Sequence, residues 1–195
     1  SGKMGVLTVG GIINSNEQII NKVNSILSNK KSSQVNIIND KLTLSVFSEL
    51  KENMSKVKDI NLIIRDSSYI PSGRVNDMIF NSYDIIEKNK LNHLNKARSM
   101  HEFIENHVNV KRVRNKAVVK SNLMLIDSDY AVFGDSSLEI TKKALTGLFK
   151  TINFNVELTD KEQVEQLSRN FELLWNSKEY TKDFKKQLLE SLNFI

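Results

Sequence analysis

The residues best suited to chemistry are concentrated in one basic segment, residues 88–120. This segment holds nine lysines and arginines against two glutamates, together with all three histidines of the chain. Its local excess of seven positive charges is larger than the +5 of the whole chain, so the remainder is close to neutral. Such a segment either contacts phosphates or forms a solvated basic face. No two of the histidines, His93, His101 and His107, are four residues apart, so their spacing indicates no helical metal site.

A second candidate for chemistry is the stretch from Lys120 to Ser137. Asp127 follows the apolar run at 123–126, and Gly134 follows a second run at 130–133. This outline resembles the phospholipase D superfamily signature, in which H-x-K-x-x-x-x-D is followed after six residues by G-S-x-N. Asp127 and Gly134 match the aspartate and the glycine of that signature.

The other positions of the signature differ in residue type. Lys120 stands where the family has its histidine, and Asn122 stands where it has its lysine. Asp135 replaces the serine, and Ser137 replaces the asparagine. In active members the histidine attacks phosphorus, while the lysine and asparagine bind phosphate oxygens without metal or cofactor. Because these groups act as a unit, the resemblance implies no catalytic residue, no cofactor and no metal here.

The likeness extends over residues 12–193. The chain resembles the phospholipase D-like domain at the N-terminus of some bacterial Swi/Snf-type helicases. The matching pieces, in order, are Ile12-Ile13-Asn14, Leu44-Ser45-Val46-Phe47, Val108 to Arg112, Asn155 to Leu158, and Phe171 to Trp175. The resemblance implies a phospholipase D-like fold and a helicase domain in the same chain or in a partner chain.

The basic residues around the altered motif predict a nucleic-acid-binding or accessory module. The residues expected to contact phosphates are Lys111, Arg112, Arg114, Lys116 and Lys120. DNA is favoured over RNA, and the absence of interleaved aromatic residues gives no indication of base stacking. Two alternatives stay open. One is a metal-independent phosphodiesterase or nuclease that works as a homodimer, and the other is a protein-interaction module with a solvated basic segment.

The elements that would position these residues alternate between helix and strand. Helical spacing predicts helices at 15–27, 44–57, 75–87, 91–107, 138–148, 159–175 and 184–192, and apolar runs predict strands at 9–13, 34–39, 61–65, 108–114, 117–127, 130–134 and 153–158. This order predicts an α/β (α+β) fold, a mixed sheet with helices on both faces. The hairpin at 117–134 is too apolar for an exposed edge, so we expect it near the centre of the sheet.

The composition bounds the protein further. The 195 residues suit one domain, which we place at 12–195 with a helical pair at its C-terminal end and a tag or leader at 1–11. No apolar run approaches the ~18 residues of a membrane span, so we expect a cytoplasmic protein that binds no membrane. The chain contains no cysteine, which excludes disulfides and thiolate chemistry. The nucleotide-binding glycine loops and the G-x-S-x-G nucleophile turn are also absent from the sequence.

Overall fold

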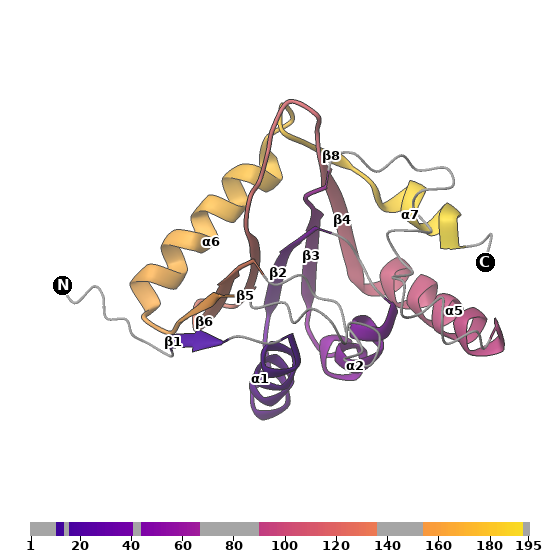
Figure 1. Cartoon of the computed structure of the whole chain (residues 1–195), viewed down its shortest axis with the longest axis horizontal. Coiled ribbons are helices and arrows are strands. Elements are labelled where there is room, and N and C mark those ends of the chain that lie inside the picture. The colour runs from indigo at the N-terminus through magenta and orange to yellow at the C-terminus, as the bar shows by residue number, and fades with distance from the viewer. Residues whose placement is uncertain (1–10, 14–15, 41–43, 67–89, 136–153, 193–195) are drawn as a thin grey trace, which may run out of the picture.

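The computed structural model describes residues 11–13, 16–40, 44–66, 90–135 and 154–192 (Figure 1). The described helices are α1 (Asn16–Asn29), α2 (Leu44–Met54), α5 (Lys90–His107), α6 (Lys161–Asn176) and α7 (Lys185–Leu192). The described strands are β1 (Gly11–Ile13), β2 (Gln34–Asn39), β3 (Asp59–Ile64), β4 (Val108–Val113), β5 (Asn122–Ile126), β6 (Tyr130–Gly134), β7 (Asn155–Leu158) and β8 (Thr181–Asp183).

The described strands form one mixed sheet in the order β1-β7-β6-β5-β2-β3-β4-β8. Strands β2, β3 and β4 run parallel, and every other neighbouring pair is antiparallel. After its first residue, each of β2 and β3 is buried at every position. Both faces of these strands are therefore covered, which explains why their sequences are rich in isoleucine and lack a polar alternation.

Two hydrophobic cores lie on opposite faces of the sheet. The larger one packs α1, α2, α5 and α7 against one face, which we call the four-helix face. The smaller one packs α6 alone against the other, the α6 face, through Val164 and Phe171. Figure 1 shows α6 apart from the other helices. The expected mixed sheet with helices on both faces is confirmed.

The central hairpin is confirmed, but it is shorter than the sequence predicts. Strand β5 pairs with β2 on one side and β6 on the other, and β6 pairs in turn with β7. The predicted strand at 117–127 is wrong for residues 117–121, because the pairing with β6 ends where Asn122 meets Gly134. Those residues form the last part of an extended connection from β4.

Two further details near the C-terminus correct the sequence reasoning. Helix α6 is capped by Asp160, whose side chain accepts a hydrogen bond from the Gln163 N–H at 3.0 Å, so the cap lies one residue after the predicted Thr159. Strand β8 was not predicted, because three polar residues carry no strand pattern. The predicted helices at 75–87 and 138–148 lie outside the described residues.

The described part of the chain contains five helices. None of its helices combines the length and the apolar character that crossing a bilayer requires.

Candidate functional site

One edge of the sheet collects polar side chains from β2, β5 and β7. Because β2 and β3 end where the antiparallel β5 and β7 begin, their terminal residues lie at the same edge. Asn122 pairs with Gly134, and Gly134 pairs with Asn155, so these residues form one row across β5, β6 and β7. Asn39 extends the row on β2, since the preceding Ile38 pairs with Leu123. We call this row the amide row.

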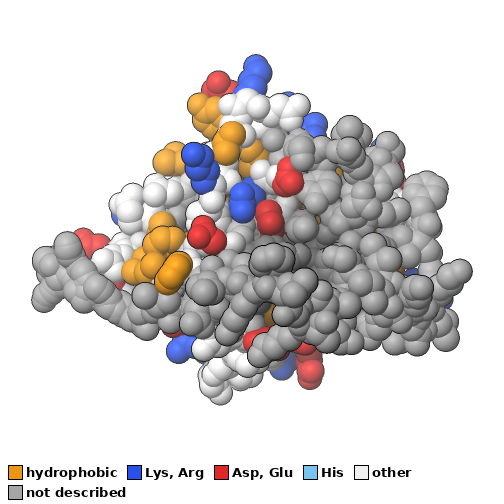
Figure 2. Space-filling view, in the orientation of Figure 1, with side chains coloured by type: hydrophobic (Ala, Val, Ile, Leu, Met, Phe, Trp, Pro, Cys, Tyr) orange, Lys and Arg blue, Asp and Glu red, His pale blue; other side chains and the backbone are white. Residues whose placement is uncertain are grey.

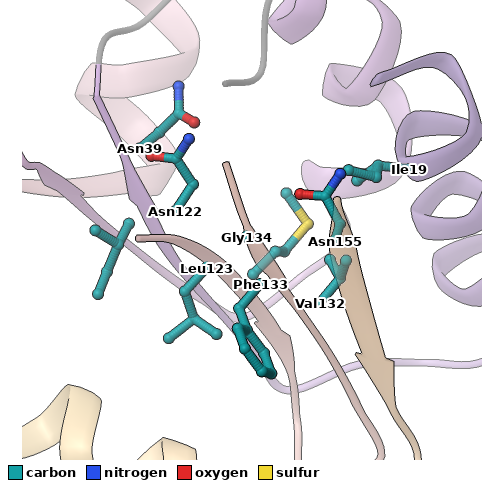
Figure 3. Close-up of a pocket in the computed structure, with 10 residues that line it drawn as sticks. Ile19, Asn39, Asn122, Leu123, Val132, Phe133, Gly134 and Asn155 are labelled. Carbon is teal, nitrogen blue, oxygen red and sulfur yellow. The ribbon is translucent and has the colours of Figure 1, made fainter. Parts of the chain in front are cut away.

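The amide row lines a small pocket that is partly open to solvent. Figure 3 shows Asn39 and Asn122 on one side of it, with Asn155 and Ile19 on the other. The three asparagines are buried, each exposing 5% of its surface or less. Their amides donate and accept hydrogen bonds but carry no charge and transfer no proton at neutral pH. The pocket is otherwise lined mainly by apolar side chains, and its three amides leave it unsuited to acid–base chemistry.

Gly134 makes this close packing possible. Its φ angle is +152°, in a region that residues with a Cβ atom rarely adopt. A Cβ atom at this position would lie 2.5 Å from Oδ1 of Asn155 and 2.8 Å from its Cα, and would also collide with the carbonyl oxygen of Phe154. The motif glycine is therefore required by the approach of β7 to β6.

Arg65 is a site residue that the sequence reasoning missed. Its Nε–H donates to Oδ1 of Asn122 at 2.6 Å, and its Nη1–H donates to the carbonyl oxygen of Val119 at 3.2 Å. Its own backbone N–H donates to the carbonyl oxygen of Asn39 at 2.8 Å. Arg65 thus brings a guanidinium from β3 to the motif position where the family has its lysine. A charged residue directly after a buried strand is the pattern that could have identified it.

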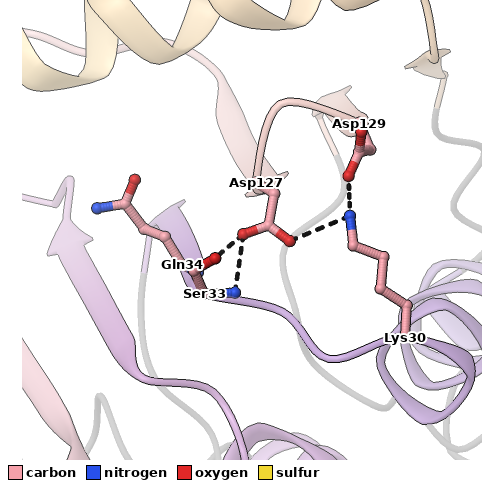
Figure 4. Close-up of polar contacts among 5 residues, drawn as sticks. All are labelled: Lys30, Ser33, Gln34, Asp127 and Asp129. Carbon is pink, nitrogen blue, oxygen red and sulfur yellow. Dashed lines mark hydrogen bonds and ion pairs between the residues drawn. The ribbon is translucent and has the colours of Figure 1, made fainter.

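Asp127, the matched motif aspartate, lies at the opposite end of β5. At roughly 3.3 Å per residue it is about 17 Å along the strand from Asn122. Its Oδ1 accepts hydrogen bonds from the N–H groups of Ser33 at 3.0 Å and Gln34 at 2.9 Å. Its Oδ2 lies 3.3 Å from Nζ of Lys30, which also contacts Asp129 (Figure 4).

The environment of Asp127 stabilises its charged form. Burial acts to raise the pKa of this carboxyl group. The N–H donors of Gln34 and Ser33, together with Lys30, outweigh burial and hold the pKa of Asp127 below its ordinary value. The aspartate therefore ties the β5–β6 turn to the start of β2, and it takes no part in the pocket.

The remaining motif positions differ in exposure. Lys120 is exposed just before β5, and Asp135 is exposed just after β6, where its N–H approaches the carbonyl oxygen of Phe154 at 3.5 Å. Ser137 lies outside the described residues.

His101 and His107 lie on α5, and α5 leads into the opposite end of β4, away from the amide row. Within the described ranges, no group of three or more histidine, aspartate and glutamate side chains could hold a metal ion.

The structure places two of the five predicted phosphate-contacting residues, Lys111 and Arg112, on opposite faces of the sheet. The Lys111 ammonium donates to the carbonyl oxygen of Trp175 at 2.8 Å and lies 4.7 Å from that ring's centre, on the α6 face. Arg112 is 6% exposed and lies over the Phe184 ring on the four-helix face. Burial lowers the pKa of Arg112, and the charge of Asp66 acts to raise it.

The other three predicted contacts lie together along the connection from β4 to β5. Arg114, Lys116 and Lys120 are exposed, and the Val119 carbonyl that Arg65 binds belongs to the same connection. We call Arg114, Lys116 and Lys120 the basic loop. Figure 2 shows charges of both signs interspersed over the described part of the face it displays, without a continuous basic area.

Known proteins resemble this chain in fold. No family model matches the sequence, and no curated protein matches it. Among solved structures, Nuc from Salmonella typhimurium, a phospholipase D family member, superimposes with a TM-score of 0.56 at 14% identity, over 89% of this chain and 95% of its own. NucT from Helicobacter pylori gives a TM-score of 0.50 at 13% identity, over 89% and 99%.

A larger enzyme shares the same fold. Phosphatidylserine synthase from Haemophilus influenzae gives a TM-score of 0.52 at 9% identity, over 97% of this chain and 44% of its own. Identities this low establish the architecture alone. The chain therefore has a phospholipase D-like fold, which confirms the fold implied by the sequence resemblance.

Proposed function

We propose that this domain binds the phosphodiester backbone of nucleic acid without cleaving it and acts as an accessory module. The observation that carries the proposal is the amide row at the candidate pocket. The residue types needed for phosphoryl transfer are replaced there by Asn122, which is 5% exposed and held by Arg65 at 2.6 Å.

The absence of a nucleophile from the motif supports a role without catalysis. A covalent route needs an activated group that attacks phosphorus, with a base beside it. An amide such as Asn122 does not attack, and an exposed lysine such as Lys120 carries a proton at neutral pH. Because cooperating catalytic groups lose nearly all activity when one of them is removed, replacement of both leaves little residual turnover.

The basic loop supports nucleic-acid binding. Its three cations are exposed, and Arg65 holds the loop against β3 through the Val119 carbonyl oxygen. A loop fixed in this way presents its charges with little loss of entropy on binding. Lys111 and Arg112 pack against rings on opposite faces of the sheet, so we assign the phosphate contacts to Arg114, Lys116 and Lys120, with Arg65 beside them.

A salt titration tests the proposal. If these residues make three or four phosphate contacts, log affinity for duplex DNA falls against log salt with a slope of about −2.7 to −3.6. Replacing Arg114, Lys116 and Lys120 together by serine flattens the slope by about two to three units and weakens binding equally for unrelated sequences. A matched triple change of the exposed Lys22, Lys161 and Lys186 to serine leaves the salt slope and the affinity nearly unchanged.

The resemblance to helicase-associated domains supports a second part of the proposal. We propose that residues 12–195 act as one unit beside a helicase motor, either in one polypeptide or as a complex. The test is the genomic reading frame together with co-purification. Continuation of the frame after Ile195 into a P-loop ATPase, or stable association with one, supports this arrangement. An isolated frame without such a partner argues for an independent binding protein.

A further inference from the structure

Strand β8 brings residues of the C-terminal segment beside the basic strand β4. Arg112 pairs directly with Lys182, and Val113 pairs with Thr181. The next residues continue this register, because the Arg114 N–H donates to the carbonyl oxygen of Tyr180 at 2.7 Å. Arg114 also donates from Nε to the carbonyl oxygen of Thr181 at 3.3 Å.

Strand pairing brings four of these residues together where β4 ends and β8 begins. Arg112 is on the four-helix face, since its guanidinium lies over Phe184 in the core on that side. Residues two apart on a strand, and residues paired across a ladder, share a face. Arg112 therefore lies on the same face as Lys182, and Arg114 and Tyr180, joined by their backbone hydrogen bond, lie beside them where β4 ends and β8 begins. We call these four residues the β4–β8 patch.

The β4–β8 patch carries an excess of positive charge. Like charges placed directly opposite on paired strands destabilise the ladder, as Arg112 and Lys182 are here. The charge of Arg112 lowers the pKa of Lys182, with smaller effects of burial and of Arg114 in the same direction. Burial lowers the pKa of Arg112, and the charge of Asp66 acts against this shift. Within the described ranges, the three cations of the patch therefore exceed the one acid that acts on them, an excess that an anion would stabilise.

Tyr180 adds an exposed aromatic ring to the patch. It is 42% exposed, and among the described residues its ring contacts no other ring and its hydroxyl makes no hydrogen bond. Its backbone is nevertheless fixed, because the Tyr180 N–H donates to both the carbonyl oxygen and Oγ of Ser177 at 3.3 Å. A ring held by a bonded turn beside cations is the arrangement on which unpaired bases stack.

We propose that the β4–β8 patch binds single-stranded nucleic acid, with a base stacked on Tyr180 and phosphates held by Arg114 and Lys182. This inference rests on the proposed function and names the form of nucleic acid that the domain prefers. Stacking on a side chain requires a base whose face is free, and a duplex presents such faces only at its ends. The nearly buried Arg112 contributes its charge from beneath and makes no direct contact.

Binding of labelled oligonucleotides tests this inference. The probes are a 15-nucleotide oligo-dT and a 15-base-pair duplex, each measured by fluorescence anisotropy at several salt concentrations. Tyr180→Ala is expected to weaken oligo-dT binding about 5- to 150-fold, the range for loss of one stacked base, while duplex affinity changes less than twofold. Tyr180→Phe keeps the ring and stays within twofold of the wild type. Lys182→Ser flattens the oligo-dT salt slope by about 0.7.

Matched variants separate stacking from general effects. Phe154→Ala removes another exposed ring, which is 64% exposed and directly precedes β7, near the other end of the strand order from β8. We expect this change to leave the affinity for oligo-dT unchanged. If Tyr180→Ala lowers the melting temperature, Tyr180→Leu keeps the bulk without an aromatic face and must show the same loss.

The possible outcomes distinguish this inference from the proposed function. If Tyr180→Ala behaves like Phe154→Ala while the basic-loop triple variant loses binding, the proposed function stands and the β4–β8 inference is overturned. If neither probe binds the wild type at low salt, both are overturned.

Discussion

Replacing Asp127 by asparagine isolates the contribution of one partly buried charge to the fold. The change keeps an oxygen that can accept from the Ser33 and Gln34 N–H groups, now 3.0 and 2.9 Å from Oδ1, and removes the ion pair with Lys30. Asparagine also tolerates the φ angle of 50° found at this position, so the backbone is not strained.

The size of the effect follows from the two hydrogen bonds. A bond to a charged acceptor contributes about 1.5–3 kcal/mol, against about 0.5–1.5 kcal/mol for a neutral one. Because Ser33 is exposed and its N–H can bond to water, most of the difference comes from Gln34. We expect Asp127→Asn to lower the free energy of unfolding by about 1–2 kcal/mol at pH 7. Asp127→Ala, which loses both bonds and adds left-handed strain, lowers it by about 3–5 kcal/mol.

The pH dependence of this loss has a definite sign. The pKa of Asp127 is lower in the folded chain than its ordinary value, so its charge stabilises the fold above about pH 3.9. This contribution disappears as the pH falls through the folded pKa. The wild type and Asp127→Asn should therefore differ at pH 7, and the difference should begin to shrink at about pH 3.9 and vanish below the folded pKa.

Urea unfolding followed by circular dichroism at a series of pH values measures this difference. Asp129→Asn is the matched control, since Asp129 contacts the same lysine but is 54% exposed, and its loss costs less than about 0.5 kcal/mol. Equal stability of the wild type and Asp127→Asn at pH 7, or a difference that does not shrink as the pH falls below about 3.9, would refute a structural role for the Asp127 charge.

Three further changes test the site and the core. Gly134→Ala forces a Cβ atom against Asn155 at a positive φ, and we expect a loss of about 2–4 kcal/mol in urea unfolding, whereas an unchanged midpoint would contradict the close approach of β7. Tyr130→Phe removes the 2.7 Å hydrogen bond to Glu157, which is 8% exposed, and should cost about 1–3 kcal/mol by the same assay. Arg65→Gln releases Asn122 and the basic loop; we expect weaker duplex binding and a salt slope flatter by about one unit, while Arg169→Gln on α6 leaves the titration unchanged.

Much of the architecture could be predicted from local pattern alone. The apolar runs in β2, β3, β5 and β6 identify strands that must be covered on both sides, and such strands can lie only in the interior of a sheet. The spacing of Phe171 and Trp175 predicts that α6 packs against the sheet through the helix face that carries these two residues. Their rings stack in the smaller core, with centroids 5.9 Å apart. These features depend on neighbours along the chain, which the sequence displays directly.

The parts of the site that were missed depend on contacts between distant segments. The role of Arg65 follows from the placement of β3 two strands from β5, and that of Asp127 from Ser33 and Lys30, more than 90 residues away. Strand β8 forms through its backbone pairing with β4. The residues Thr181–Asp183 have no strand pattern of their own. Strand alternation alone predicts that the side chains of Lys111 and Arg112 point to opposite faces of the sheet. The structure adds that Lys111 packs on the Trp175 ring and Arg112 on the Phe184 ring.

We propose that this phospholipase D-like domain binds nucleic acid and leaves it intact. The most direct measurement follows both properties in one sample. A labelled single strand and its duplex are incubated with the wild type at a concentration that saturates anisotropy, with EDTA or with Mg²⁺, and the same mixtures are run on a denaturing gel. The account predicts full binding and full-length product throughout. Cleavage by the wild type that disappears in Lys120→Ala, in a variant that still binds, would contradict it.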